Sequence, residues 1–227
     1  MEEEIKSLDA ALINLVSLEK DLGTKFELRT LGTVVQGTIC FLTIAANTLD
    51  EGKRRLKFSK KDDWNNLMAF INRAFYANLH TAIEVELLEF CSRKNIEVSL
   101  TQRRKRIEEF EQTLKPKIPP SLTAEIESFI QKILPDRPST LDILNSALKE
   151  TQFSKEDKKY FRNLYEALSV LRNKSSHSDI SLTDGDKLKL ENAQLTFLVT
   201  SSGTLQSQPG HYSHLAKMVS LFLERLS

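Results

Sequence analysis

Residues 155–177 read KEDKKYFRNLYEALSVLRNKSSH, an amphipathic pattern followed by a short polar run. The apolar residues recur at steps of three and four, which predicts a helix with one side against a core; they are Phe161, Leu164, Leu168 and Leu171. The following serines compete with the backbone for hydrogen bonds, so they predict the end of that helix. Residues five apart on an unbroken helix point about 140° apart. Arg172 and His177 can therefore converge only if the helix ends between them.

Arg172 lies four residues after Leu168 and seven after Tyr165, at the edge of the predicted buried side. A partly buried guanidinium needs a carboxylate or phosphate partner, and Glu84 or Glu86 could supply the carboxylate or orient His177. A structural explanation is also open. Arg172 could complement the dipole at a helix C-terminus, with His177 as a cap or loop residue.

The motif Arg172-Asn173-x-x-x-His177 resembles that of the HEPN superfamily of all-α domains, whose nuclease members carry an Arg, a polar residue and a His at this spacing. The stretches Tyr160–Leu171 and Phe70–Tyr76 resemble the paired core helices of that family. The resemblance covers about residues 30–226, but only the six-residue motif is specific.

The resemblance implies a metal-independent endoribonuclease of the toxin or antiviral type, which leaves a 2′,3′-cyclic phosphate. It assigns His177 as general base, Arg172 as the ligand of the phosphate oxygens and Asn173 as the residue that orients phosphate or imidazole. Lys174, Ser175 and Ser176 are the candidate substrate-binding residues. Two such motifs typically meet across a dimer interface in the family. The implied partners are tRNA or mRNA, a second copy and an antitoxin or other regulatory protein, in the cytoplasm.

Composition limits these alternatives. The chain has 227 residues, of which 40% are hydrophobic and 28% charged, so it can bury one substantial core. Its formal net charge of +1 gives no global attraction to nucleic acid. The basic clusters at residues 53–55, 60–61 and 103–106 could contact phosphates, with Phe58 and Trp64 stacking on bases. Solvated helix faces and a core Trp64 are the favoured explanations, because acidic residues lie near each cluster.

The expected fold is an all-α, HEPN-like antiparallel bundle forming one domain over residues 1–227. We expect core helices at about residues 5–22, 31–49, 62–92, 155–174 and 212–226, and an insertion at about 93–153. Prolines bracket a short helix at Ala124–Leu134 within that insertion. Four Ser/Thr-x-x-Asp signatures predict helix starts; they begin at Ser59, Ser139, Ser154 and Thr183. The long helix at 62–90 should bury Leu67, Phe70, Ile71, Phe75, Leu79, Ile83 and Leu87.

Residues 31–49 carry no charge, and a buried central helix is favoured there over a membrane span. A helix that is apolar nearly all round also suits burial by a second subunit. Cys40 and Cys91 lie in apolar stretches, which favours buried thiols in a reducing compartment. The acidic N-terminus is typical of neither a signal peptide nor a transit peptide.

Residues 189–208 allow helix or strand. Thr183 favours a helix to about Val199, followed by a loop or small hairpin and a last helix at Tyr212–Leu226. His211 and His214 could face one metal ion, but no carboxylate or thiolate neighbour completes a site. We therefore expect neither metal nor cofactor. His80 follows Leu79 and is expected to be a hydrogen-bonded core or interface histidine.

Two other functions remain open. The chain could be a catalytically silent HEPN-type module in which protein contacts bury Arg172 and His177, whereas a nuclease needs them to face an open cleft. It could also be an unrelated helical scaffold. Monomeric behaviour, or a continuous helix through Ser175 and Ser176, would favour the scaffold and count against the nuclease.

Overall fold

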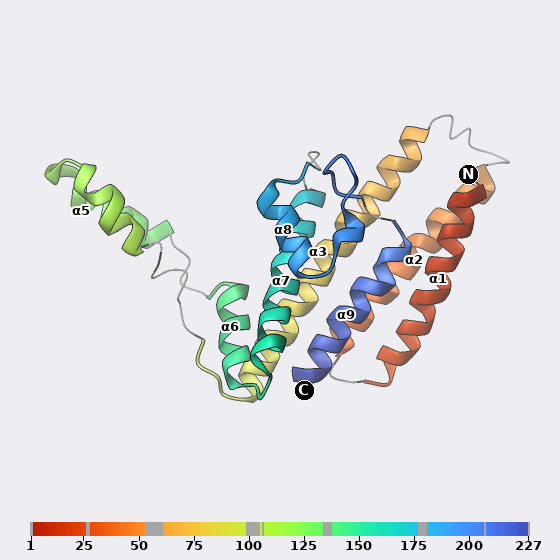
Figure 1. The fold of residues 1–227 in the computed structure, drawn as a ribbon, viewed down its shortest axis with the longest axis horizontal. Coiled ribbons are helices and arrows are strands. Elements are labelled where there is room, and N and C mark those ends of the chain that lie inside the picture. The colour runs from red at the N-terminus through yellow and green to blue at the C-terminus, as the bar shows by residue number, and fades with distance from the viewer. Residues whose placement is uncertain are drawn as a thin grey trace. The chain divides into compact units, whose positions relative to one another are not determined.

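The computed structural model describes residues 2–25, 28–52, 61–98, 105, 107–133, 138–176, 181–206 and 208–226. The described chain is all-α, as predicted (Figure 1). Its helices are α1 (Glu2–Gly23), α2 (Arg29–Gly52), α3 (Lys61–Arg93), α5 (Pro120–Ile133), α6 (Thr140–Glu150), α7 (Lys155–Ser176), α8 (Asp184–Asn192) and α9 (Gly210–Leu226), with short turns η2 (Phe110–Leu114), η3 (Lys115–Lys117) and η4 (Thr196–Leu198).

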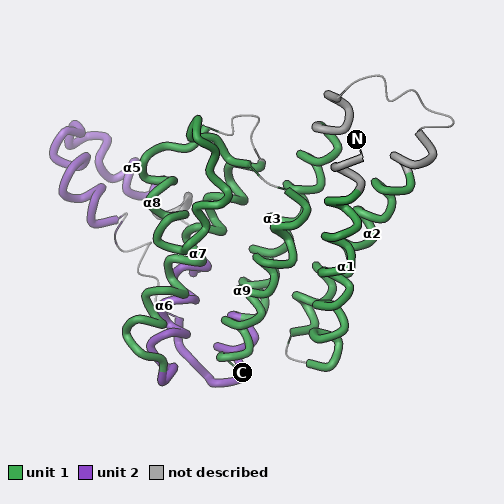
Figure 2. Tube along the Cα trace, turned by 45° about the vertical axis from the view of Figure 1, so that its right-hand side comes forward, with its two compact units in different colours: residues 1–86, 153–227 green, residues 87–152 purple. Residues whose placement is uncertain are grey.

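The chain divides into two compact units (Figure 2). The first comprises residues 1–86 and 153–227, and the second comprises residues 87–152. The second unit overlaps the segment expected to be an insertion at about residues 93–153. The predicted catalytic motif belongs to the first unit.

In the first unit, α1 packs against α2 and α9, and these three helices lie side by side in Figure 1. The buried positions follow helical spacing on each helix, so one apolar stripe per helix faces the common core. On α1 they are Leu8, Ala11, Leu15 and Leu22, and on α2 they are Leu31, Val35, Thr38, Leu42 and Ala45. Burial of each large aliphatic side chain contributes about 1.5–3 kcal/mol.

Aromatic contacts join α9 to two further helices of this unit. The rings of Phe75 on α3 and Tyr212 on α9 have centroids 4.5 Å apart, and those of Phe161 on α7 and Phe222 on α9 are 4.6 Å apart. The hydroxyl of Tyr212 donates a hydrogen bond to Oδ1 of Asn72, so this fully buried phenol has its polar atom satisfied. Helix α9 therefore contacts α1, α3 and α7.

Helix α3 confirms the long helix predicted at residues 62–90, with two exceptions on its predicted buried face. Ile71, Phe75, Leu79, Ile83 and Leu87 are buried, but Leu67 is half-buried and Phe70 is 55% exposed. Its ring packs edge-on against Phe41 of α2 at 6.2 Å between centroids. The prediction of a core Phe70 was wrong. Phe70 packs against Phe41, which is itself exposed, so the pair lies at the surface.

Three of the four predicted helix starts are confirmed. Ser139 and Thr183 form complete capping boxes at α6 and α8, and Ser154 accepts a hydrogen bond from the Asp157 amide at α7. In each case the hydroxyl satisfies a backbone N–H that has no partner within the helix. The fourth start, at Ser59, lies outside the described residues.

Helix α2 is less buried than predicted. Its stretch Arg29–Asn47 is long and apolar enough to cross a membrane by length and composition alone, a test that core helices also pass, and 28% of the window is buried. Ile44 is 62% exposed and Phe41 is 44% exposed. Cys40, predicted to be buried, is exposed, whereas Cys91 is buried. One side of α2 contacts α1 and α9, and another side faces α3, where Phe41 meets Phe70 and the Thr30 amide meets Glu86.

The segment between α8 and α9 differs from the expected helix to Val199. Helix α8 ends at Asn192, and Gln194 adopts a positive φ of 60°, which a continuing helix does not allow. The chain then makes η4 and two isolated antiparallel bridges, Ser181 to Thr204 and Val199 to Leu205. Gly203, at φ 76°, turns the chain between them. The hairpin alternative therefore describes residues 199–205 better than the helix does.

In the second unit, α5 begins at Pro120, which suits the first turn of a helix because that position needs no N–H donor. It starts four residues before the predicted Ala124. Lys115 of η3 forms a 2.6 Å ion pair with Glu127 of α5. The predicted helix at Ala124–Leu134 lies within α5 up to Ile133, where α5 ends, and Leu134 lies outside the described residues.

Candidate active site

Arg172 lies on an exposed part of α7, close to the C-terminal end of that helix. Nη1 of its guanidinium lies 3.4 Å from Nδ1 of His80 on α3. The expectation that a carboxylate or phosphate would partner Arg172 therefore missed an imidazole contact. Arg172 is exposed, so contacts within this chain do not bury it.

His80 is 3% exposed and is surrounded by side chains of α7. Its Nε2 lies 3.4 Å from Oγ of Ser169, and its ring packs against Tyr165 at 5.2 Å between centroids. Burial lowers the pKa of His80 below its ordinary value, and the Arg172 charge lowers it further, while Glu84 partly raises it. The imidazole is therefore neutral at pH 7. The expectation of a hydrogen-bonded core histidine is confirmed.

The end of α7 differs from the sequence prediction. The helix continues through Ser175 and Ser176 instead of stopping at them, and Ser176 is its last described residue. This is the outcome that was expected to favour a scaffold over a nuclease. The hydroxyl of Ser175 donates back to the carbonyl of Arg172 at 3.1 Å, which a helical serine can do without breaking the helix. Nε of Arg73 donates to the Ser175 carbonyl at 2.8 Å and satisfies one of the final acceptors.

Lys174 contacts two groups near the start of α8. Its Nζ donates to the Ser181 carbonyl at 2.6 Å and pairs with Asp186 at 3.4 Å. Burial raises the pKa of Asp186, but hydrogen bonds from Thr183 and the Lys174 charge outweigh burial, so the net shift is downward. These contacts tie the end of α7 to the start of α8. The substrate-binding role of Lys174 stays a prediction.

The structure describes the side chains of some of the remaining motif residues and not of others. Asn173 is exposed next to Arg172, and Ser175 is half-buried. His177 and the side chain of Ser176 lie outside the described residues. Of the six predicted site residues, the structure thus brings together Arg172, Asn173, Lys174 and Ser175 on the last turn of α7.

Glu84 and Glu86, the two glutamates suggested as partners of Arg172, have different surroundings. Oε1 of Glu86 accepts a hydrogen bond from the Thr30 amide at 3.3 Å, at the N-terminus of α2, and this carboxylate is buried. Glu86 therefore accepts a hydrogen bond at the start of α2. Glu84 influences His80 electrostatically, so it acts on the site through the imidazole.

His211 and His214 flank one aromatic ring. Their rings meet Phe197 edge-on at 5.0 and 5.3 Å between centroids, and Nδ1 of His211 accepts the Gln208 amide at 3.2 Å. Burial and the neighbouring His214 lower the pKa of His211. Among the described residues, no group of three or more His, Cys, Asp and Glu side chains could hold a metal ion.

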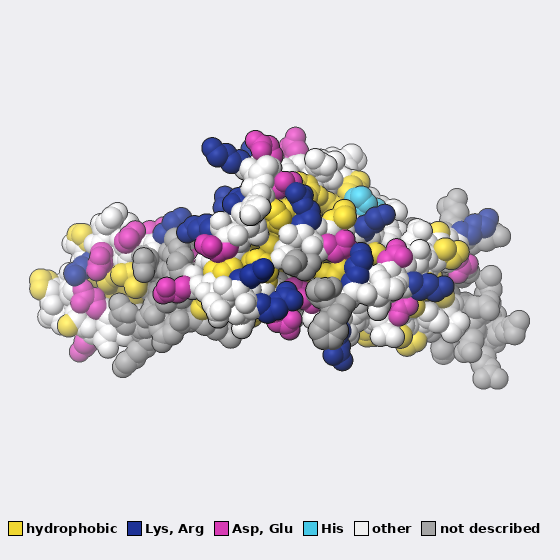
Figure 3. All heavy atoms as spheres, turned by 90° about the horizontal axis from the view of Figure 1, so that it is seen from below, with side chains coloured by type: hydrophobic (Ala, Val, Ile, Leu, Met, Phe, Trp, Pro, Cys, Tyr) yellow, Lys and Arg dark blue, Asp and Glu magenta, His cyan; other side chains and the backbone are white. Residues whose placement is uncertain are grey.

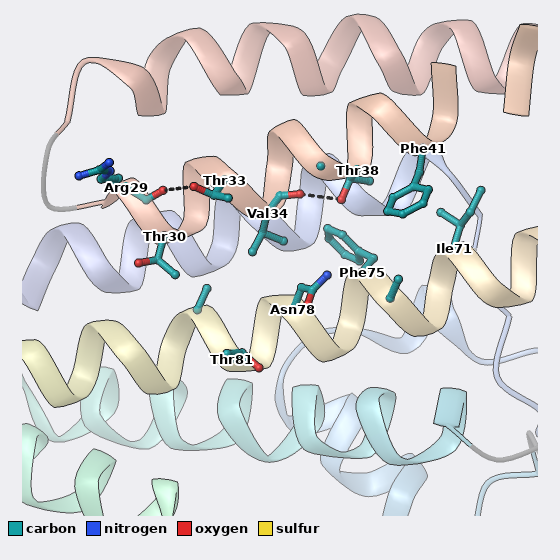
Figure 4. A pocket seen from close by; sticks show the side chains of 13 residues that line it. Arg29, Thr30, Thr33, Val34, Thr38, Phe41, Ile71, Phe75, Asn78 and Thr81 are labelled. Atoms are coloured by element: carbon teal, nitrogen blue, oxygen red, sulfur yellow. Dashed lines mark hydrogen bonds between the residues drawn. The ribbon is translucent and has the colours of Figure 1, made fainter. Parts of the chain in front are cut away.

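A groove of about 500 Å³ lies between α2 and α3 (Figure 4). Val34 and Phe75 are among its lining residues, and Thr33 and Thr38 donate to carbonyls of their own helix at 3.1 and 2.8 Å. Its α3 wall includes Asn78, which lies about 160° around that helix from His80, and Thr81, which lies about 100° from it. The groove does not include Arg172.

On the face shown in Figure 3, Lys and Arg side chains are interspersed with Asp and Glu, and they form no broad basic patch there. Most of the basic clusters predicted at residues 53–55, 60–61 and 103–106 lie outside the described residues, as do Phe58 and the side chain of Trp64. Lys105 is described and exposed. The cations that the structure does place near the motif are Arg73 and Lys174.

Sequence reasoning did not assign His80 or Arg73 to this site. A signal was available, because they lie seven residues apart and therefore share one face of α3. No family model matches this chain, and neither a curated protein nor a solved structure is significantly similar to it. The resemblance to HEPN nucleases therefore rests on the motif alone.

Proposed function

We propose that the protein is a metal-independent endoribonuclease in which Arg172 binds the scissile phosphate and His177 acts as general base. The observation that carries the proposal is an exposed Arg172 held at the end of α7 by a buried neutral imidazole. A planar guanidinium suits the non-bridging oxygens of a phosphate, because it can donate two parallel hydrogen bonds. Asn173 would orient the phosphate or the base.

The reaction begins when the ribose 2′-oxygen attacks the adjacent phosphorus. The 2′-hydroxyl gives its proton to His177, the bond from phosphorus to the 5′-oxygen breaks, and the leaving oxygen takes a proton from a general acid. The products are a 2′,3′-cyclic phosphate and a 5′-hydroxyl. Arg172 offsets the negative charge that develops on the phosphorane oxygens.

One copy of the motif supplies one imidazole, whereas base and acid catalysis require two groups. We propose that a second copy of the chain supplies the other. The groove on the α2 side is less well placed for this, because its lining does not include Arg172 and Asn78 on its α3 wall faces away from His80. The interface that joins two motifs is therefore proposed at the end of α7.

The biological setting follows from the resemblance. A toxin or antiviral nuclease in the cytoplasm would act on tRNA or mRNA and would be held inactive by an antitoxin or other regulatory protein. The interspersed charge on the face in Figure 3 fits a protein that contacts RNA locally.

A catalytically silent interaction module or a helical scaffold is the second candidate. The continuation of α7 through Ser175 and Ser176 favours it, because a scaffold needs no break there. The contacts of Arg73 and Lys174 at the helix end have a structural explanation on this view. The two candidates differ in whether Arg172 acts on RNA.

The test is incubation of the purified protein with mixed tRNA and mRNA in excess EDTA, with detection of 2′,3′-cyclic phosphate ends. Wild type should cleave, and Arg172→Ala should lower the rate about 10²–10³-fold because a transition-state donor is lost. His177→Ala should lower it about 10²–10⁴-fold because the base is lost.

Matched controls are Lys159→Ala, which removes an exposed cation of α7, and His214→Ala, which removes an exposed histidine of α9. Both should retain full cleavage. Intact RNA after incubation with wild type would decide for the silent module or scaffold.

A further inference from the structure

We infer that His80 is a positioning residue that holds the guanidinium of Arg172 for phosphate binding, as a neutral hydrogen-bond acceptor. This inference rests on the proposed function. His80 cannot be the second acid or base itself, because it is 3% exposed and has no access to substrate. Its action has to pass through Arg172.

The hydrogen bonds around His80 assign the proton of its imidazole. The hydroxyl of Ser169 donates its single hydrogen to the Tyr165 carbonyl at 3.0 Å. The same oxygen must then accept a hydrogen from Nε2 of His80, 3.4 Å away. Nε2 therefore carries the proton, and Nδ1 presents its lone pair to the Arg172 guanidinium.

The spacing of residues on α7 explains why three of its side chains meet His80. Tyr165, Ser169 and Arg172 lie at spacings of four and three on α7, so they form one line of side chains along the face that covers His80. The imidazole is thus fixed by a ring, by a hydroxyl and by its helix. Of the five guanidinium N–H donors, one is directed to Nδ1 of His80.

Protonation of His80 would end the contact. Nδ1 would become a donor facing a cation, and Arg172 would lose the acceptor that His80 supplies. The charged and titratable groups that face His80 are Arg172 and Tyr165 from α7 and Glu84 from α3. Arg172 and burial oppose protonation, and Glu84 favours it. Arg172 should therefore stay aligned at neutral pH and lose alignment in acid.

The activity test compares His80→Leu with His80→Asn, whose side-chain oxygen can replace Nδ1 as acceptor. His80→Leu should lower kcat about 10–100-fold with a smaller change in KM, because a displaced Arg172 fails in the transition state. His80→Asn should recover part of this loss. In Arg172→Lys, the leucine change should cost little more, because both changes remove the same interaction.

The pH profile gives a second readout. Below the pKa of the base, log(kcat/KM) of wild type should fall with slope one and then steepen to about two once His80 also protonates. The slope for His80→Asn should stay near one. Equal activity and an equal profile in wild type and His80→Leu would overturn the inference and leave the proposed function standing.

An experiment without RNA separates the two proposals. NMR titration of the histidine rings should show the His80 pKa rising in Arg172→Ala, because a nearby cation is removed, while the His211 pKa stays constant. A His80 pKa unaffected by Arg172→Ala would show that the contact is absent in solution and would overturn the inference. If wild type fails to cleave RNA, the proposed function falls, and the titration alone decides the contact.

Discussion

At the scale of single residues, Arg225 joins the end of α9 to the start of α7. Its guanidinium donates two hydrogen bonds to the Asp157 carboxylate, at 2.9 and 2.8 Å. It also lies over the rings of Phe153 and Phe161, 5.0 and 5.4 Å from their centroids. Paired donors and an aromatic platform make this pair more specific than most surface ion pairs.

We predict that Arg225→Ala and Asp157→Asn both lower the urea midpoint at pH 7. Hydrogen bonds from Arg225, then from Ser154, hold the pKa of Asp157 below its ordinary 3.8. The ionised pair therefore stabilises the fold above pH 3.8, and this contribution is lost as the pH falls through the lower folded pKa. Wild type and Asp157→Asn should converge in acid.

Urea denaturation followed by circular dichroism at several pH values measures this effect. Lys187→Ala is the control, because it removes an exposed ion pair with Asp184 between residues of one helix. It should leave the midpoint unchanged. A constant gap between wild type and Asp157→Asn down to pH 2 would contradict the assigned role of the carboxylate.

At the scale of helices, local signals predicted most of the fold. Apolar spacing located α3, α7 and α9, and the hydroxyl-x-x-Asp signatures located the starts of α6, α7 and α8. The ends were harder because they depend on partners distant in the sequence. Ser175 remains helical where its carbonyl meets Arg73, which no local pattern reveals. Helix α8 ends early where Gln194 takes a positive φ.

The start of α8 gives a test at this scale. Thr183→Ala should lower the unfolding free energy by about 0.5–2 kcal/mol, because the hydroxyl caps the Asp186 amide and donates to its carboxylate. Asp186 also pairs with Lys174, so the tie between α8 and the end of α7 should loosen. Urea denaturation measures the loss of stability.

Thr183→Ser is the matched variant, because it retains the hydroxyl and should restore most of the stability. Thr196→Ala is a second control, since this exposed threonine caps no α-helix. Equal stability of wild type and Thr183→Ala would show that the capping box contributes nothing at α8.

At the scale of the whole molecule, the candidate site depends on tertiary packing. Sequence alone selected Arg172 and its neighbours because they lie together in one motif. His80 lies 92 positions from Arg172, and only the packing of α3 on α7 brings the imidazole to the guanidinium. Phe70 and Cys40 show the same limit, since apolar spacing does not reveal which side of a helix another helix will cover.

The proposed composite site predicts a dominant-negative effect. If one site needs His177 from two copies, exchange of wild type with an equal amount of His177→Ala should lower the activity per wild-type chain to about half. A ninefold excess of the variant should lower it to about a tenth. Mixed dimers cause the loss, because each contains only one of the two imidazoles.

The mixing experiment requires subunit exchange, which differently labelled chains and native mass spectrometry can follow. Ile44→Asp is the structural control for the other candidate interface, because it places a charge on the exposed side of α2. It should leave the dimer and the cleavage rate unchanged if the copies meet at the end of α7. Activity that stays proportional to wild-type chains despite complete exchange would show that one copy carries a whole site. Dissociation by Ile44→Asp would place the interface on α2.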